Sequence, residues 1–163
     1  MRRTWIMTMS SGAVGMAFLV APAVPAAAAE TPFKADFSVQ ASFVPLSPGV
    51  LAGSTSGAGK AAHLGRMTVS STEVLDFTAV PGAVTVRDGR MVLVAASGDE
   101  VFGTYATIGP LPDANGYLPL SGTFVVTGGT GRFSDATGGG TIEGVASVVT
   151  GIASLSYRGT ITR

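Results

Sequence analysis

The sequence has no cysteine, a single histidine and few charged residues. Without cysteine, no disulfide, thiolate metal site or lipid-modified cysteine can form, so core burial and backbone hydrogen bonds must stabilise the fold. A single histidine also makes a zinc site improbable, because such sites use several Cys or His ligands. The ten basic and ten acidic residues form no basic cluster, which argues against nucleic-acid binding. We therefore expect no metal, no cofactor and no nucleic-acid partner.

The first 29 residues have the layout of a secretory signal peptide. Arg2 and Arg3 form a basic start, small and apolar residues follow, and the alanines at 26–29 offer an A-x-A type cleavage site. The alternative is a membrane anchor, but the apolar stretch falls short of the about 20 strongly apolar residues that a span needs. We predict that residues 1–29 are removed, by Sec or twin-arginine export. Residues 30–163 then form one secreted or periplasmic domain without membrane attachment.

The remainder of the chain shows the alternation of apolar and polar residues that is typical of half-buried strands. In residues 36–43, for example, Phe37, Val39 and Phe43 share one face while serines occupy the other. The glycine- and serine-rich residues 53–59 instead predict a flexible loop by their composition. The predicted strands are 36–43, 62–72, 73–80, 83–87, 90–96, 100–108, 120–127, 141–150 and 152–162.

Turn signals divide these strands at regular intervals. Glycine is abundant, with 23 residues, and the dipeptide Asp88–Gly89 predicts a hairpin turn. Short turns favour up-and-down pairing, and closure of the sheet removes exposed edges. We therefore predict an all-β fold, a closed antiparallel barrel of about eight strands, in preference to a sandwich.

Residues 128–140 form the most distinctive stretch, a glycine-rich segment between two predicted strands. A phosphate-binding loop would need a different glycine spacing and a following helix. We interpret the stretch as a tight connection in which glycines adopt positive φ. Phe133 is expected to plug one barrel end, and Arg132 to hydrogen-bond exposed carbonyls. The residues of this structural motif are Gly128, Gly129, Gly131, Arg132, Phe133 and Gly138.

Together with residues 63–68 and 97–104, residues 128–138 resemble the equivalent segments of the allene oxide cyclase and dirigent-protein superfamily. The resemblance is to its bacterial secreted members in particular, and it spans most of the chain after the leader. It implies an eight-stranded antiparallel barrel with an apolar cavity, often assembled as a trimer. Plant members cyclise an unstable epoxide or steer radical coupling in that cavity. The shared motifs are turns and strand ends, so the resemblance assigns no catalytic residue here.

Four side chains inside predicted strands are candidate ligand-binding residues. Tyr105 and Tyr157 are the first two, because a buried phenol usually needs a hydrogen-bond partner, which a ligand can supply. The alternative for both is a core tyrosine. Arg66 and Glu143 are the other two, either as an ion pair inside the barrel or as residues of its solvated face.

Other polar residues do not form a recognisable catalytic arrangement. His63 is interpreted as a structural residue at a strand start, since the chain has no G-x-S-x-G motif. Asp99 and Glu100 are adjacent and point to opposite faces, so they form no carboxylate dyad. We interpret Asp99 as a turn cap. Residues 113–116 lack the closing glutamate of a calcium loop and predict a turn.

These observations leave three hypotheses for function. The first is an exported barrel that binds a small apolar molecule in its lumen. The second, from the resemblance, is a cofactor-free cyclase or isomerase, or dirigent-like stereocontrol of a reaction in the cavity. The third is a non-catalytic surface or matrix component with a packed lumen and an extensive interface between copies.

Overall fold

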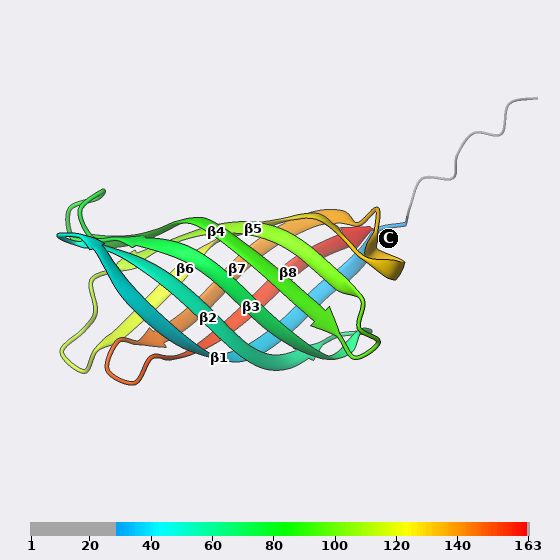
Figure 1. Ribbon diagram of the computed structural model, residues 1–163, viewed down its shortest axis with the longest axis horizontal. Coiled ribbons are helices and arrows are strands. Elements are labelled where there is room, and N and C mark those ends of the chain that lie inside the picture. Colours follow the sequence, from blue (N-terminus) through cyan, green and yellow to red (C-terminus); the bar gives the residue numbers. More distant parts are fainter. Residues whose placement is uncertain (1–28, 163) are drawn as a thin grey trace, which may run out of the picture.

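Eight antiparallel strands close into a barrel in chain order, with β1 paired to both β2 and β8 (Figure 1). This computed structural model describes residues 29–162, so the predicted signal peptide lies outside the described residues except for Ala29. The all-β closed barrel predicted from the sequence is confirmed. The elements are β1 (Thr31–Ser47), β2 (Val50–Ala61), β3 (Gly65–Asp76), β4 (Ala83–Ala95), β5 (Glu100–Pro110), β6 (Tyr117–Gly129), the 3₁₀ turn η1 (Gly131–Phe133), β7 (Thr137–Ser147) and β8 (Ile152–Thr162).

Side chains alternate between the lumen and the outside along the strands, as the period of two predicts. On β1, Phe33, Ala35, Phe37 and Val39 are buried, and the residues between them are exposed. The inward face is mainly apolar, so the lumen is also the hydrophobic core. No helix within residues 29–162 has the length and apolarity needed to cross a membrane.

The glycine- and serine-rich segment 53–59 is part of strand β2, so the prediction of a flexible loop was wrong. A Cβ added at Gly57 would lie 2.1 Å from the Ser38 carbonyl oxygen on β1. Glycine is therefore needed at this position because β1 approaches so closely. The small residues reflect close strand packing, and composition alone does not distinguish that from flexibility.

Two predicted strand breaks are also wrong. No break occurs between Thr72 and residues 73–80, because β3 continues to Asp76 with only a register shift against β4 between Thr72 and Val74. The Asp88–Gly89 pair is no hairpin turn and lies inside β4, where the register against β5 shifts. Asp88 has a φ of 56°, which identifies a β-bulge, a feature that uses the same residue types as a turn.

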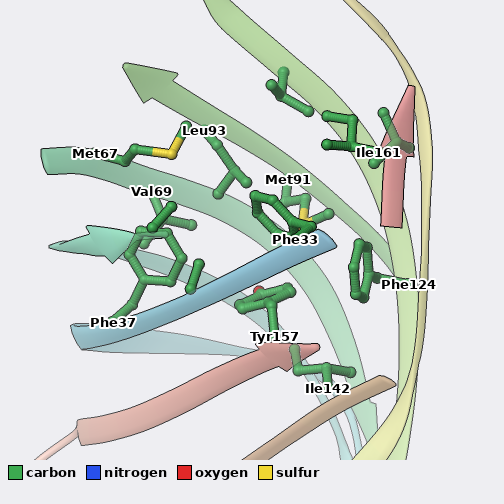
Figure 2. Close-up of a cluster of buried hydrophobic side chains, with 14 of the residues drawn as sticks. Phe33, Phe37, Met67, Val69, Met91, Leu93, Phe124, Ile142, Tyr157 and Ile161 are labelled. Atoms are coloured by element: carbon green, nitrogen blue, oxygen red, sulfur yellow. The ribbon is translucent and has the colours of Figure 1, made fainter. Parts of the chain in front are cut away.

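Aromatic side chains fill the half of the barrel nearest the two chain ends. The Tyr157 ring lies edge-on to Phe37 and Phe124, with centroid separations of 5.7 and 5.3 Å. Figure 2 shows the three labelled side chains within the buried cluster. Phe33 packs on Phe124 at 5.8 Å. Since these residues come from β1, β6 and β8, the cluster joins the strands at which the barrel closes.

The turn η1 seals that end of the barrel. Phe133 is fully buried, which confirms the predicted plug. Arg132 was expected to hydrogen-bond carbonyls, but its guanidinium lies 4.8 Å from the centre of the Phe133 ring and 3.4 Å from the Asp99 carboxylate. The motif glycines with positive φ are Gly128, Gly131 and Gly138.

Candidate functional site

The opposite half of the lumen contains a cavity of about 70 Å³. It lies toward the end of the barrel where β1–β2, β3–β4, β5–β6 and β7–β8 are joined, and partly exposed Phe43 and Val148 belong to its wall. We call this end the mouth. The apolar residues that line the cavity are Val39, Ala41, Phe43, Leu75, Val86, Leu118, Leu120, Ile142, Ala146, Val148, Ala153 and Leu155.

The mouth carries most of the large apolar side chains that are exposed in the described part of the chain. They come from the end of β1, from the loops that follow β3 and β5, from the β7–β8 turn and from the first residues of β6 and β8. An apolar rim therefore surrounds an apolar cavity. The rim residues are Phe43, Val44, Leu46, Val80, Leu111, Tyr117, Val148, Val149 and Ile152.

A small polar cluster lies within this apolar lumen. The Tyr105 hydroxyl donates to Glu73 Oε2 over 2.8 Å, and the Ser71 hydroxyl donates to the same oxygen over 3.2 Å. Ser71 Oγ is also hydrogen-bonded to Thr55 Oγ1. Strands β2, β3 and β5 position these groups, and Glu73 is only 7% exposed. The cluster is thus a buried carboxyl group held by neutral hydroxyl donors.

Burial determines the electrostatics of this cluster. It raises the pKa of Glu73, and the hydrogen bonds from Tyr105 and Ser71 oppose that effect only in part. Burial, and next the negative charge of Glu73, raise the pKa of Tyr105. The phenol therefore keeps its proton and stays a hydrogen-bond donor. No Lys, Arg or His side chain lines the cavity, so the described residues supply no countercharge inside it.

Thr107 adds an unusual feature to the same cavity wall. Its Oγ1 is the one buried side-chain oxygen or nitrogen without a hydrogen-bond partner in the described part of the chain. Buried polar groups are nearly always paired, because leaving one unpaired costs about 1–3 kcal/mol. The unpaired Thr107 hydroxyl is fully enclosed, so it costs stability in the protein as described.

The four candidate residues from the sequence lie in different places. Tyr105 belongs to the cluster, whereas Tyr157 lies deeper, within the aromatic core. Burial, and next the charge of Glu73, raise the pKa of Tyr157, which indicates that this phenol lies near the cluster. Arg66 and Glu143 are exposed, so of the two alternatives for this pair the interior ion pair is wrong and the solvated face is correct. Both side chains point outward, since they alternate along β3 and β7 with the residues that face the lumen.

The sequence reasoning missed Glu73, Ser71, Thr55 and Thr107. The signal for Glu73 was available, because it continues the inward phase of Met67 and its successors along β3. Because a strand break was predicted between residues 72 and 73, the alternation was not followed across it. Thr55 was concealed by the mistaken loop, and Thr107 occupies an inward position of β5 without distinctive neighbours.

The remaining polar motifs are structural. His63 is exposed in the β2–β3 turn with a φ of 63°. Asp99 accepts a hydrogen bond from Ser97 over 2.8 Å, and Asp113 accepts one from the Asn115 amide over 2.9 Å. Within residues 29–162, no three His, Asp or Glu side chains gather as a group that could hold a metal ion.

No protein-family model, curated protein or solved structure matches this chain.

Proposed function

We propose that this protein is an exported carrier or receptor that binds a small, largely apolar molecule in the mouth half of its barrel. The observation that carries the proposal is the buried Glu73–Tyr105 pair inside an otherwise apolar cavity. Apolar walls supply most of the binding free energy in small-molecule sites, and a few polar groups set orientation and specificity. The cavity and cluster have this composition.

The size of the cavity limits what enters it. A volume of about 70 Å³ is large compared with the about 10–15 Å³ that admits one water molecule. It is small compared with the about 300–1,000 Å³ typical of sites for drug-sized ligands. A slender alkyl chain or a small ring fits, and a longer ligand extends across the apolar rim.

The sequence resemblance supports the same proposal, because an allene oxide cyclase or dirigent-like barrel is expected to enclose an apolar cavity. The resemblance also implies a trimer, which light scattering of the purified protein would measure. A purely structural barrel, the third hypothesis, would have a packed lumen, and the cavity at the mouth counts against it.

A second candidate function is a cofactor-free isomerase or cyclase. The observation that favours it is the raised pKa of Glu73 in an apolar pocket, since burial tunes carboxyl groups toward general acid–base work near neutral pH. In this case Glu73 would move a proton on the bound molecule, while Tyr105 would hold the carboxyl group in place.

The proposed binding is tested by an NMR titration of the purified protein with 1-hexanol. We expect shifts at amides around the cavity. The variant Ala146→Leu, which fills the lumen, should weaken binding by about tenfold or more, since a displaced chain of two or more methylenes loses over 1.4 kcal/mol. Val145→Leu changes the neighbouring exposed residue on the same strand and should leave binding unchanged. Shifts that ignore the cavity, or equal binding by Ala146→Leu, would contradict the proposal.

A further inference from the structure

The hydrogen-bond donors of the polar cluster are almost all in use. Ser71 and Tyr105 each have one hydroxyl proton, and both hydroxyls lie within hydrogen-bond distance of Glu73 Oε2; the Tyr105 hydroxyl also lies 3.1 Å from Ser71 Oγ. If Ser71 donates to Glu73, it accepts the proton of Thr55 in their mutual hydrogen bond. The hydroxyl protons of Ser71, Tyr105 and Thr55 are then all used within the cluster.

One acceptor of the cluster is open by contrast. Glu73 Oε1 accepts no hydrogen bond from the described residues, whose contacts to this carboxyl group all go to Oε2. Thr107, in the same wall, has an unused proton and unused lone pairs, but its Oγ1 is fully enclosed. The open polar atom of the cluster is therefore Glu73 Oε1, which only accepts hydrogen bonds when the carboxyl group is ionised.

The site lacks a positive charge. Two hydroxyl donors on Oε2 favour the ionised form of Glu73, but burial outweighs them and raises the pKa of this carboxyl group. An ionised carboxyl group in an apolar cavity is costly unless a cation pairs with it, and the described cavity wall contains no Lys, Arg or His. A bound cation that donates a hydrogen bond to Glu73 Oε1 would favour the ionised carboxyl group and supply the missing positive charge.

We infer that the ligand of this cavity is an apolar amine, whose ammonium group pairs with Glu73 and whose hydrocarbon body occupies the lumen. An ammonium group has three donors and no acceptor, so it can donate to the open Glu73 Oε1. A carboxylate ligand is excluded by charge repulsion. A neutral alcohol would gain one hydrogen bond but would leave the charge of Glu73 unpaired. This inference rests on the proposed binding function and specifies its ligand class.

The test compares three probes with the same six-carbon chain, hexylamine, 1-hexanol and hexanoate, by NMR titration of the purified protein at neutral pH. We expect hexylamine to bind about tenfold or more tightly than 1-hexanol, and hexanoate to bind weakest, since a buried charge pair contributes more than one neutral hydrogen bond. If 1-hexanol binds as tightly as hexylamine, or hexanoate binds best, the amine inference is wrong and the proposed function stands. If none of the three binds, both are wrong.

Variants then assign the effect to one side chain. Glu73→Gln keeps the shape of Glu73 and removes its charge, so hexylamine affinity should fall about tenfold or more while 1-hexanol affinity changes less than about threefold. Glu143→Gln is the matched control, because Glu143 is exposed on the outside of β7, and it should change neither. Unchanged hexylamine affinity in Glu73→Gln would overturn the inference.

A pH series tests the wild-type protein without any substitution. Protonation of Glu73 removes its charge, so hexylamine affinity should fall as the pH is lowered through the raised pKa of Glu73, while 1-hexanol affinity stays constant. The only other titratable group in the described cavity wall is Tyr105, and Tyr157 lies in the aromatic core against Phe37 and Phe124. Both phenols have raised pKa values and stay neutral throughout. Hexylamine affinity that does not change with pH would contradict the inference.

Discussion

At the scale of single residues, the unusual feature is Glu73, an ionisable side chain among the inward-facing residues of β3. Glu73 occupies an inward position that its neighbours Val69 and Leu75 fill with hydrocarbon. A buried carboxyl group costs stability unless its oxygens are paired, and only one of the two oxygens is paired here. Such a residue is easier to explain by binding or chemistry than by folding.

We predict that the difference in stability between Glu73→Gln and the wild-type protein depends on pH. Because burial raises the folded-state pKa of Glu73 above its usual value of 4.5, the folded state binds more protons than the unfolded state between these two pKa values. Stability of the wild-type protein therefore falls as the pH rises through this window. Glu73→Gln lacks that loss, so urea denaturation should show its stability, relative to wild type, increasing from pH 4 to pH 8.

The control for this series is Glu143→Gln, whose stability relative to wild type should not follow the same trend. Asp36 acts in the opposite direction, since hydrogen bonds from Ser156 and Arg158 lower its pKa. The contribution of Asp36 to stability is lost as the pH falls. Since Asp36 is present in every variant, this contribution cancels in the stability difference between variant and wild type. A difference that stays constant with pH would refute the raised pKa of Glu73.

The unpaired hydroxyl of Thr107 leads to a second prediction at this scale. Thr107→Val replaces the hydroxyl with a methyl group of similar size and should raise the free energy of unfolding by about 1 kcal/mol, since no hydrogen bond is lost. Thr104→Val, at an exposed position of the same strand, should change it by less than about 0.5 kcal/mol. Urea denaturation measures both. Destabilisation by Thr107→Val would show that the hydroxyl has a partner.

At the scale of elements, the connections and the glycine-rich strand determine how tightly the barrel closes. The turn η1 places Phe133 over the packed end, and β2 lets β1 come close through its glycines. The turn η1 and strand β2 both contain glycine, which composition alone associates with flexibility. In the structure these glycines allow close contact between neighbouring segments.

Removal of the Phe133 ring should destabilise the protein. Phe133→Ala should lower the free energy of unfolding by about 3–5 kcal/mol, because the ring is fully buried and its loss leaves a cavity. Ser134→Ala, at the adjacent exposed position, should change it by less than about 0.5 kcal/mol. Chemical denaturation measures both variants. A stable Phe133→Ala protein with altered 1-hexanol binding would show that the turn belongs to the ligand site instead.

The strand β2 provides the other prediction at this scale. Gly57→Ala should destabilise the protein by about 1–3 kcal/mol, because the new Cβ would lie 2.1 Å from the Ser38 carbonyl oxygen and the strands would have to separate. Ser56→Ala, at an exposed neighbouring position, serves as the control. A thermal melt that leaves Gly57→Ala unchanged would support a flexible loop here instead of a strand.

At the scale of the whole molecule, the barrel has a solid half and a hollow half. The β1–β8 pairing extends only from Thr31 to Gln40 on β1, whereas β1 continues with β2 to Ser47. The β1–β2 hairpin therefore extends past the closed ladder at the mouth (Figure 1). Residues 42–47 of β1 are exposed there, so fewer apolar contacts stabilise this end.

Hydrogen exchange should reveal this gradient. Amides of β1 between residues 35 and 39 should exchange only on global unfolding, because buried side chains and two neighbouring strands protect them. Amides between residues 42 and 47 should exchange faster by about tenfold or more, through local opening of the hairpin. Native-state exchange followed by NMR measures both groups. Equal protection would contradict the division into two halves.

The sequence by itself determined the class of fold and the packed end. Alternation along residues 36–43 and 152–162 depends only on near neighbours in the chain, and it predicted β-strands and their inward faces correctly. Phe133 was predicted as a plug because a large apolar residue in a short connection between strands has few other places to lie.

The tertiary structure alone decided where the polar site lies. Glu73 and Tyr105 are far apart in the chain and meet only because the barrel brings β3 and β5 around one lumen. The close approach of β1 to Gly57, and the bulge at Asp88–Gly89, likewise depend on neighbouring strands rather than on local composition. Local preferences determine which segments extend, whereas burial, pairing and countercharge depend on the closed barrel, and these properties define the site.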